Sequence, residues 1–544
     1  MSIFQTKTDT AKLIMNYAAV CLCGCVFVLL SASWVSPLFK DSYGYDSSWY
    51  SMMGRAITQG MVPYRDYFDL KGPAFFFIEA IGQFFHHGRI GIFIIECIAA
   101  SVSCIFIWKT CNLYIRHWQT WLILIVTAFV AISPFWGGNT CEEYMLPFNF
   151  ACIYLTLKYL KEENYEEFFL PSLVFGLSFS VMVLSKITTC APMGAAALTV
   201  LIVLIMKKQT KALPGIIGYF LLGFVIIFIP VCVYFLLHGA FRDFIYAAFI
   251  FAYKRGTDYY ETFSWDWESK LIICYTSFIA ALIIPTRKSG EHYLRIFGVL
   301  LSLITWAFLH LGTPYDYYFL LTMPCFIYTM MSMFAHWTNR GMNISHIENG
   351  RASELIEARG NGMDNDAPDM RNFKDYILPQ DMIKLKRTIR PDKKRITMQR
   401  RILWIILLLI VLNHYYPSTK FKIRENTNLA RRDSDPYVEE CREVLNIVPK
   451  EEWNKIYDLE SGMIFYEVNQ LLPANRYPVN LPYFMHLNPE IKSNVLKYLD
   501  VVKPTYIMSE NMANFDDNDT RDYVFNHYEL HTDVGAEEIY IRID

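Results

Sequence analysis

The sequence predicts a polytopic α-helical membrane protein that ends in a small α/β domain. Hydrophobic residues make up 53% of the 544 residues, and charged residues make up only 19%. Apolar runs approaching the roughly 17–25 residues that cross a bilayer recur from the N-terminus to residue 414. No basic patch with interleaved aromatic residues points to nucleic acid, and the net charge of −2 indicates no partner because the charges are segregated along the chain.

About eleven transmembrane helices account for these runs. The expected spans are 14–36, 90–109, 119–136, 147–160, 167–185, 187–206, 213–237, 269–286, 295–311, 317–335 and 402–414. Cytoplasmic loops carry an excess of Lys and Arg. With the N-terminus inside, every second loop obeys this rule. The basic segments that then fall inside are 109–116, 158–161, 207–211, 287–295 and 337–401.

One apolar segment, residues 74–85, is too short to span and carries Glu79. A span there would invert the charge parity downstream, so we expect a helix in the outer membrane interface. The outer loops are then 37–89, 137–146, 238–268 and 312–316, all within a transmembrane module of residues 1–335. A polar cytoplasmic insert (336–401), a last transmembrane helix (402–414) and an extracytoplasmic α/β domain (415–544) follow.

The first outer loop combines acidic, aromatic and basic side chains in a way that merely joining two helices does not require. Aromatic rings with carboxylates can bind sugars, and Lys or Arg can bind phosphate. The candidate residues are Asp46, Tyr64, Asp66, Tyr67, Asp69 and Lys71. Aromatic residues also decorate any membrane interface, which is the alternative interpretation of each single ring.

The later outer loops add further candidates. Glu142 and Glu143 stand where a helix re-enters the membrane, although an acidic first turn can also stabilise a helix N-terminus. Neighbours on a helix point about 100° apart, and we expect Glu143 to face the cavity. Cations at the outer edge could bind phosphate or simply snorkel. The remaining candidates are Lys186, Lys254, Arg255, Tyr315 and Asp316.

The order of these motifs resembles a known family. Asp46 follows the first helix and precedes Gly-x-x-Pro-Tyr-x-Asp at 60–66 and Asp-x-Lys-Gly-Pro at 69–73. This is similar to the first outer loop of bacterial relatives of protein O-mannosyltransferases and of lipid A aminoarabinose transferases. These are GT-C fold glycosyltransferases that use polyprenyl-phosphate sugars. The chain departs from the family wording at Ser47 and Gly72, and has Tyr317 where the late motif has His.

The resemblance implies a role for each motif. Asp46 corresponds to the general base on the acceptor hydroxyl, in an inverting transfer from which polyprenyl phosphate leaves. Glu142 or Glu143 corresponds to the second acidic position, and Lys71 to the lysine that meets the lipid phosphate. Lys186, Lys254 and Arg255 are phosphate candidates from position alone. We place acceptor or sugar binding at the other outer-loop candidates, which are Tyr64, Asp66, Tyr67, Asp69, Tyr315 and Asp316.

The expected protein is therefore a multi-pass enzyme of the bacterial cytoplasmic membrane with its site outside. Its partners are a polyprenyl-phosphate-linked sugar, membrane lipid and an envelope glycan, lipid or protein as acceptor. The sequence implies no cofactor and no metal site, although the outer carboxylates could hold a divalent cation. Two other classes remain open, namely a lipid-linked-sugar transporter or flippase and a non-catalytic envelope-assembly protein. A scaffold would not need Asp46, Lys71 and the Glu pair.

Overall fold

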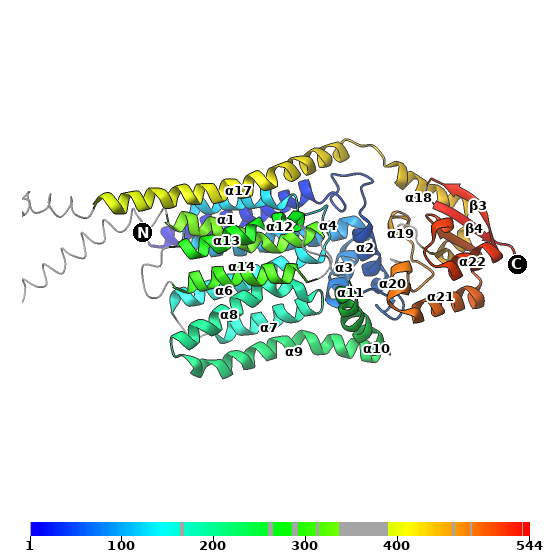
Figure 1. The fold of residues 1–544 in the computed structure, drawn as a ribbon, viewed down its shortest axis with the longest axis horizontal. Helices are drawn as coiled ribbons and strands as arrows, with labels where there is room; N and C mark the ends of the chain where they lie inside the picture. The colour runs from blue at the N-terminus through cyan, green and yellow to red at the C-terminus, as the bar shows by residue number, and fades with distance from the viewer. Residues whose placement is uncertain are drawn as a thin grey trace, which may run out of the picture.

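The computed structural model consists of a helical bundle with a small α/β domain at one end (Figure 1). It describes residues 2–163, 168–258, 265–284, 292–311, 315–336, 390–459, 463–478, 481–535 and 537–544. Most of the expected cytoplasmic insert, residues 337–389, lies outside the described residues. The same holds for positions 312–314 of the fourth outer loop.

Each expected span coincides with helical structure. The bundle comprises α1 (Ser2–Ser31), α4 (Arg89–Asn112), α5 (His117–Ala131), α6 (Cys141–Glu162), α7 (Phe169–Val183), η1 (Ile187–Cys190), α8 (Ala191–Met206), η2 (Thr210–Ala212), α9 (Leu213–Leu237), α13 (Ile272–Ile283), α14 (His292–Leu309), a helix at 323–336 and α17 (Arg390–Ala430). Pairs that lie side by side include α7 with α9, α1 with α4, and α4 with α6. The polytopic helical fold class is thus confirmed.

Seven helical segments in the described part are long and apolar enough to cross a membrane by length and composition. Shorter apolar helices include α5, α7 and α13, so the count of eleven spans stays a prediction. Large apolar side chains on α9 are exposed, as a lipid-facing helix requires. They are Ile217, Leu221, Leu222, Val225, Ile226, Ile229, Val233, Leu236 and Leu237.

The first outer loop folds into two helices of its own, α2 (Tyr45–Thr58) and α3 (Pro73–Phe85). Both lie at the end of the bundle next to the C-terminal domain (Figure 1). The short apolar segment expected in the membrane interface is α3. Its exposed side chains are Ile81, Phe84 and Phe85. Its orientation in the bilayer remains a prediction.

Short elements from later in the chain gather at the same end of the bundle. They are α10 (Phe241–Ile245), the π-helix η3 (Tyr246–Phe251), α11 (Ala252–Asp258), α12 (Trp265–Lys270) and η5 (Asp316–Thr322). The N-terminus lies at the opposite end (Figure 1). Away from the C-terminal domain, the loops between helices are basic, as the sequence predicts. There Lys161 donates to the Leu113 carbonyl oxygen and Lys207 lies 3.7 Å from Glu163.

The last bundle helix is longer than the sequence predicts. Instead of ending at residue 414, α17 continues through Pro417 to Ala430, so the α/β domain starts later than expected. The extension contains Pro417 and several Ser, Thr and Asn residues, so its packing along the bundle and not helix propensity accounts for it. Asn426 donates to the Leu30 carbonyl oxygen at 3.0 Å, and the ammonium of Lys422 lies 5.0 Å from the ring centre of Trp136.

The C-terminal domain is a four-stranded sheet with helices, and this part of the fold class is confirmed. The strands run in the order β1-β2-β4-β3, with β1 parallel to β2 and the other pairs antiparallel. Its elements are α18 (Pro436–Ile447), η6 (Lys450–Lys455), β1 (Tyr457–Asp458), α19 (Met463–Val468), α20 (Leu481–Leu487), α21 (Pro489–Val502), β2 (Tyr506–Ser509), η7 (Met512–Asn514), α22 (Asn518–His527), β3 (Tyr528–Val534) and β4 (Glu537–Arg542).

Candidate active site

Asp46 lies in the first turn of α2, with Gly44 at the N-cap. The positive end of the helix dipole favours a carboxylate at this position. Its side chain is partly exposed, and the hydroxyl of Tyr317 lies 3.4 Å from Oδ2, so this hydrogen bond is a long one. Asp46 is therefore held in place at the end of the bundle while its carboxylate remains open to a further hydrogen-bond donor.

Tyr50 lies one helical turn beyond Asp46 and shares its face of α2. The ammonium of Lys71 donates to the Tyr50 hydroxyl at 2.7 Å. Burial, followed by the charge of Asp46, raises the pKa of Tyr50 well above its usual value, so the phenol stays neutral. In the described part of the chain Lys71 has no ion pair with a carboxylate, which leaves its positive charge available to an anionic ligand.

The stretch that carries Lys71 is fixed to the end of α7. The backbone N–H groups of Gly72 and Ala74 donate to the carbonyl oxygens of Ser185 and Leu184, each at 2.8 Å. Lys71 directly precedes Gly72 in the sequence, and Lys186 directly follows Ser185. Two lysines more than a hundred positions apart are thereby brought to the same end of the bundle.

Lys186, which is partly buried, and the buried Glu142 form an ion pair, with 2.6 Å between Nζ and Oε1. The ammonium also lies 3.3 Å from the ring centre of Tyr318. Burial alone would lower the pKa of Lys186, but Glu142 and Tyr318 outweigh it and raise the pKa, so the group stays charged. The other oxygen of Glu142, Oε2, is buried without a hydrogen-bond partner among the described residues.

Glu143, which we expected from the sequence to face the cavity, points away from Lys186, because neighbours on a helix point about 100° apart. Its Oε1 accepts a hydrogen bond from the Thr140 hydroxyl at 2.9 Å, and its side chain lies near the buried Glu96. Glu142, not Glu143, faces the lysine and the tyrosines. The geometry therefore favours Glu142 as the acidic residue of this site.

Arg255 joins the cluster from α11, directly after the π-helix, a form that is often found at functional sites. Its guanidinium lies 5.5 Å from the ring centre of Tyr483 in the C-terminal domain. Burial lowers its pKa, but neighbouring tyrosines, Tyr315 first, raise it overall, so Arg255 is charged and close to η5. Lys254 has an exposed side chain and lies on a different face of α11.

The other predicted residues of the first loop shape the loop itself. Trp49 and the backbone of Lys71 donate to Asp69, and the Val62 N–H and Arg65 donate to Asp66. The hydroxyls of Tyr64 and Tyr67 donate to the carbonyl oxygens of Lys71 and Pro473, at 2.7 and 2.8 Å. Three of these residues thus hold the loop in shape, and Tyr67 joins it to the C-terminal domain. Sugar binding by these four residues remains a prediction.

Asp316 and its neighbour Tyr317 contact different partners. Tyr317 reaches Asp46, whereas Asp316 pairs with Lys270 at 2.9 Å. Tyr315 is 40% exposed and stacks on Tyr317, with 5.4 Å between the ring centres. Asp316 instead lines a polar hollow of about 210 Å³ with Asp266, His414 and Ser418, and so stands apart from the Asp46 cluster.

Sequence reasoning missed Tyr50, Tyr318 and Tyr483 as members of the cluster. The position of Tyr50 four residues after Asp46 was the available signal, because such a pair shares a helix face. Nothing in the sequence connects Tyr483 with Arg255. Among the described residues, no group of three or more His, Cys, Asp or Glu side chains is arranged to hold a metal ion.

Comparison with known proteins finds one family match and similar solved structures. Residues 72–234 match the family described as dolichyl-phosphate-mannose-protein mannosyltransferase. ArnT from Cupriavidus metallidurans has a similar structure, both bound to undecaprenyl phosphate (12% identity, TM-score 0.57) and in the apo state (11% identity, TM-score 0.54). Each match covers 98% of both chains. No curated protein matches in sequence. The resemblance that the motifs indicated is confirmed, and the fold is the GT-C fold of ArnT.

Proposed function

We propose that this chain, which has the GT-C fold of ArnT, is an integral membrane glycosyltransferase. In this proposal it moves a sugar from a polyprenyl-phosphate donor to an extracytoplasmic acceptor in the cell envelope, with inversion. The single observation that carries the proposal is a group of tyrosines at one end of the bundle that one carboxylate and three cations share. Tyr317 contacts Asp46 and Tyr50 contacts Lys71. Lys186 lies over the ring of Tyr318, and Arg255 lies near Tyr315 and Tyr318. The name of the matched mannosyltransferase family and the lipid phosphate bound by ArnT support this assignment.

Asp46 serves as the general base. Its carboxylate takes the proton of the acceptor hydroxyl, and the hydroxyl oxygen forms a bond to the anomeric carbon. The bond between that carbon and the phosphate oxygen breaks, and polyprenyl phosphate leaves with the electron pair. The weak contact with Tyr317 supports this role, since a base that is already fully hydrogen-bonded could not accept the proton.

The cations hold the phosphate of the donor and stabilise the charge that develops as it leaves. Lys71 is the strongest candidate, because its hydrogen-bond partner in the described structure is the neutral phenol of Tyr50. Arg255 lies among tyrosines, Tyr315 first, and the Asp69 carboxylate is also near it. Lys186 already has a carboxylate partner in Glu142. Its role is therefore to add positive charge near the donor phosphate, which Lys71 and Arg255 bind directly.

The site faces outside the cytoplasm in this proposal. The basic loops lie at the end of the bundle away from the C-terminal domain, and Lys and Arg mark the cytoplasmic side. Asp46, α3 and the C-terminal domain are then extracytoplasmic. A polyprenyl chain in the outer leaflet would present its phosphate at that height, where the exposed apolar side chains of α3 also meet the bilayer.

Transfer of sugar by the reconstituted protein tests the proposal. Purified protein in lipid vesicles is given undecaprenyl-phosphate-linked hexoses and pentoses, and transfer to envelope extracts is followed by mass spectrometry. Asp46→Asn should lower kcat by about 10²–10⁴, while binding of undecaprenyl phosphate, measured separately, stays unchanged. Wild-type turnover by Asp46→Asn would remove the catalytic assignment and favour a transporter. Cells lacking the protein should also lose one envelope glycan.

A further inference from the structure

Helix α2, which carries Asp46, lies between the membrane-side helix α3 and helix α19 of the C-terminal domain. A Cβ on Gly54 of α2 would lie 2.7 Å from the backbone of Glu79 in α3, so the two helices touch without a side chain between them. A helix of 14 residues has little stability of its own and takes its position from its neighbours. What holds α2 therefore also sets the position of Asp46.

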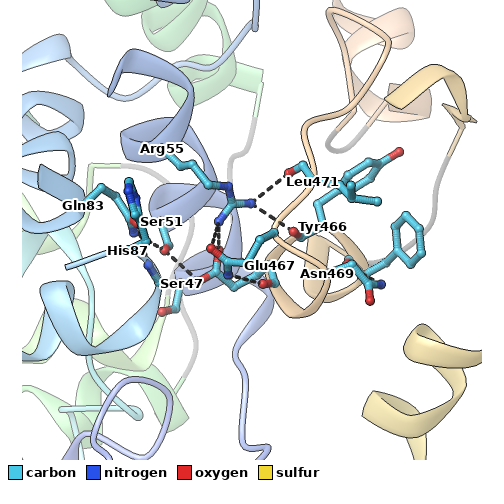
Figure 2. A network of polar contacts seen from close by, with 12 residues as sticks. Ser47, Ser51, Arg55, Gln83, His87, Tyr466, Glu467, Asn469 and Leu471 are labelled. Carbon is cyan, nitrogen blue, oxygen red and sulfur yellow. Dashed lines mark hydrogen bonds and ion pairs between the residues drawn. The ribbon is translucent and has the colours of Figure 1, made fainter. Parts of the chain in front are cut away.

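Arg55, near the C-terminal end of α2, is the main link to the C-terminal domain (Figure 2). Its Nη1 lies 2.7 Å from Oε2 of Glu467, and both side chains are almost fully buried. Its Nη2 donates to the carbonyl oxygens of Tyr466 and Leu471 at 3.0 and 2.8 Å, and Nη1 also reaches Gln470 at 3.3 Å. One guanidinium thus bonds both the end of α19 and the turn that follows it.

The same network continues into α3. Ser51 of α2 donates to Oε1 of Glu467 at 3.0 Å, and Gln83 of α3 donates to the Ser51 hydroxyl at 2.7 Å. Oε1 of Gln83 accepts the backbone N–H of Gly88, also at 2.7 Å. A chain of buried polar contacts therefore joins the C-terminal domain, α2 and α3 in one arrangement (Figure 2).

Further contacts bind the first loop to the segment after α19. The N–H of Phe68 donates to the Arg476 carbonyl oxygen at 2.8 Å, and the Arg476 guanidinium donates to the Tyr64 carbonyl oxygen and pairs with Asp243 at 2.6 Å. The surface pair of Arg442 and Asp41, at 2.7 Å, joins the same two parts of the chain but is exposed. The buried and the exposed pair therefore make a matched comparison.

We infer that Arg55 and Glu467 are positioning residues, through which the C-terminal domain holds α2, and with it Asp46, against the phosphate-binding cations. The inference rests on the proposed function. A buried ion pair is weak evidence for stability, because two well-packed apolar side chains would often serve as well. This pair instead fixes the orientation of α19 relative to α2. The guanidinium of Arg55 bonds one carboxylate and two carbonyl groups at once, and this geometry allows only one placement of α19. Displacement of a reacting group by as little as about 1 Å can cost on the order of 10² in rate.

The test compares Glu467→Gln and Arg55→Gln with the control Arg442→Gln in the full-length protein. Each buried-pair variant should lower kcat for sugar transfer by at least about tenfold, with KM for the donor within about threefold, since Asp46 and not the phosphate site is displaced. The double variant should lose no more than the worse single variant, because the two side chains act as one unit. Arg442→Gln should stay within about twofold of wild type, as expected for an exposed pair.

Hydrogen exchange gives a readout that does not depend on activity. Peptides that cover α2 and α19 should exchange faster in Glu467→Gln and as in wild type in Arg442→Gln. The inference is wrong if the exchange rate of neither peptide changes. It is also wrong if the folded Glu467→Gln protein keeps full kcat. Both outcomes count against the inference even if Asp46→Asn is inactive. If the wild type transfers no sugar, the proposed function fails, and the exchange result still decides whether the pair holds α2. Arg55→Lys, which keeps the charge but loses the fork, should be intermediate and covers the case in which Arg55→Gln does not fold.

Discussion

The amide nitrogen of Gly72 lies 2.8 Å from the carbonyl oxygen of Ser185, and a Cβ on Gly72 would lie 2.1 Å from the carbonyl oxygen of the preceding Leu184. The backbone at Gly72 is in the extended region, where any residue is allowed, so space and the hydrogen bond are the reasons for glycine. This explains why the chain departs from the proline that the family wording has at the same position. The contact brings Lys71 and Lys186 together.

Substitution of Gly72 tests this contact. Gly72→Ala should destabilise the protein by about 1–3 kcal/mol, because the methyl group must push the loop off the end of α7. Gly72→Pro should be worse, since it also removes the N–H that bonds Ser185. Gly194→Ala in α8, where a Cβ would meet nothing within 4 Å, is the matched control and should be neutral or stabilising. Thermal unfolding in detergent measures all three, and equal melting temperatures for the two alanine variants would contradict the explanation.

Removal of the Lys71 ammonium should act mainly on donor binding. A hydrogen bond to a charged group contributes about 1.5–3 kcal/mol, so Lys71→Ala should weaken binding of undecaprenyl phosphate roughly tenfold to hundredfold. The effect on kcat should be smaller, because the phosphate is present before the reaction as well as in the transition state. Lys497→Ala, which removes an exposed lysine on α21 of the C-terminal domain, serves as the control. An unchanged affinity in Lys71→Ala would exclude the lysine from the phosphate site.

The two neighbouring glutamates should respond differently to loss of charge. Glu142→Gln leaves the Lys186 ammonium without its carboxylate in a mostly buried position, and breaking such a pair costs about 3 kcal/mol or more. Both the melting temperature and sugar transfer should fall. Glu143→Gln removes one of two carboxyl groups that lie near each other, so the melting temperature should stay the same or rise. The reverse order of the two melting temperatures would show that Glu143 carries the structural ion pair.

The sidedness of the membrane arrangement can be measured directly. A cysteine placed at Asp516, which is exposed in the C-terminal domain, should react with a membrane-impermeant maleimide in intact cells. A cysteine placed at Asp364, in the expected cytoplasmic insert outside the described residues, should react only after the membrane is broken. The unmodified chain with its thirteen native cysteines gives the background. Labelling of position 364 alone in intact cells would invert the topology and remove the proposed site geometry.

Much of the fold followed from local patterns in the sequence. Apolar runs and Lys/Arg parity identified the helices, because the bilayer sets the length of a span and the charge rule sets its direction. The order of motifs in one short loop predicted Asp46 and Lys71 as site residues. Boundaries were less certain: α17 runs on to Ala430, since packing on α1 extends it beyond the apolar stretch.

Pairings between distant residues could not follow from the sequence. The rotation of one helix against its neighbours decides that Glu142 and not Glu143 meets Lys186. In the same way it decides that Asp316 pairs with Lys270. The sequence by itself determined a helical membrane protein with the GT-C fold and the order of its outer-loop motifs, because hydropathy, charge and motif spacing are properties of short stretches of chain. Only the tertiary structure decided that Lys186 meets Glu142, that Arg255 meets Tyr483 and that Arg55 holds Glu467, because such contacts are set by how helices pack and not by the spacing of residues along the chain.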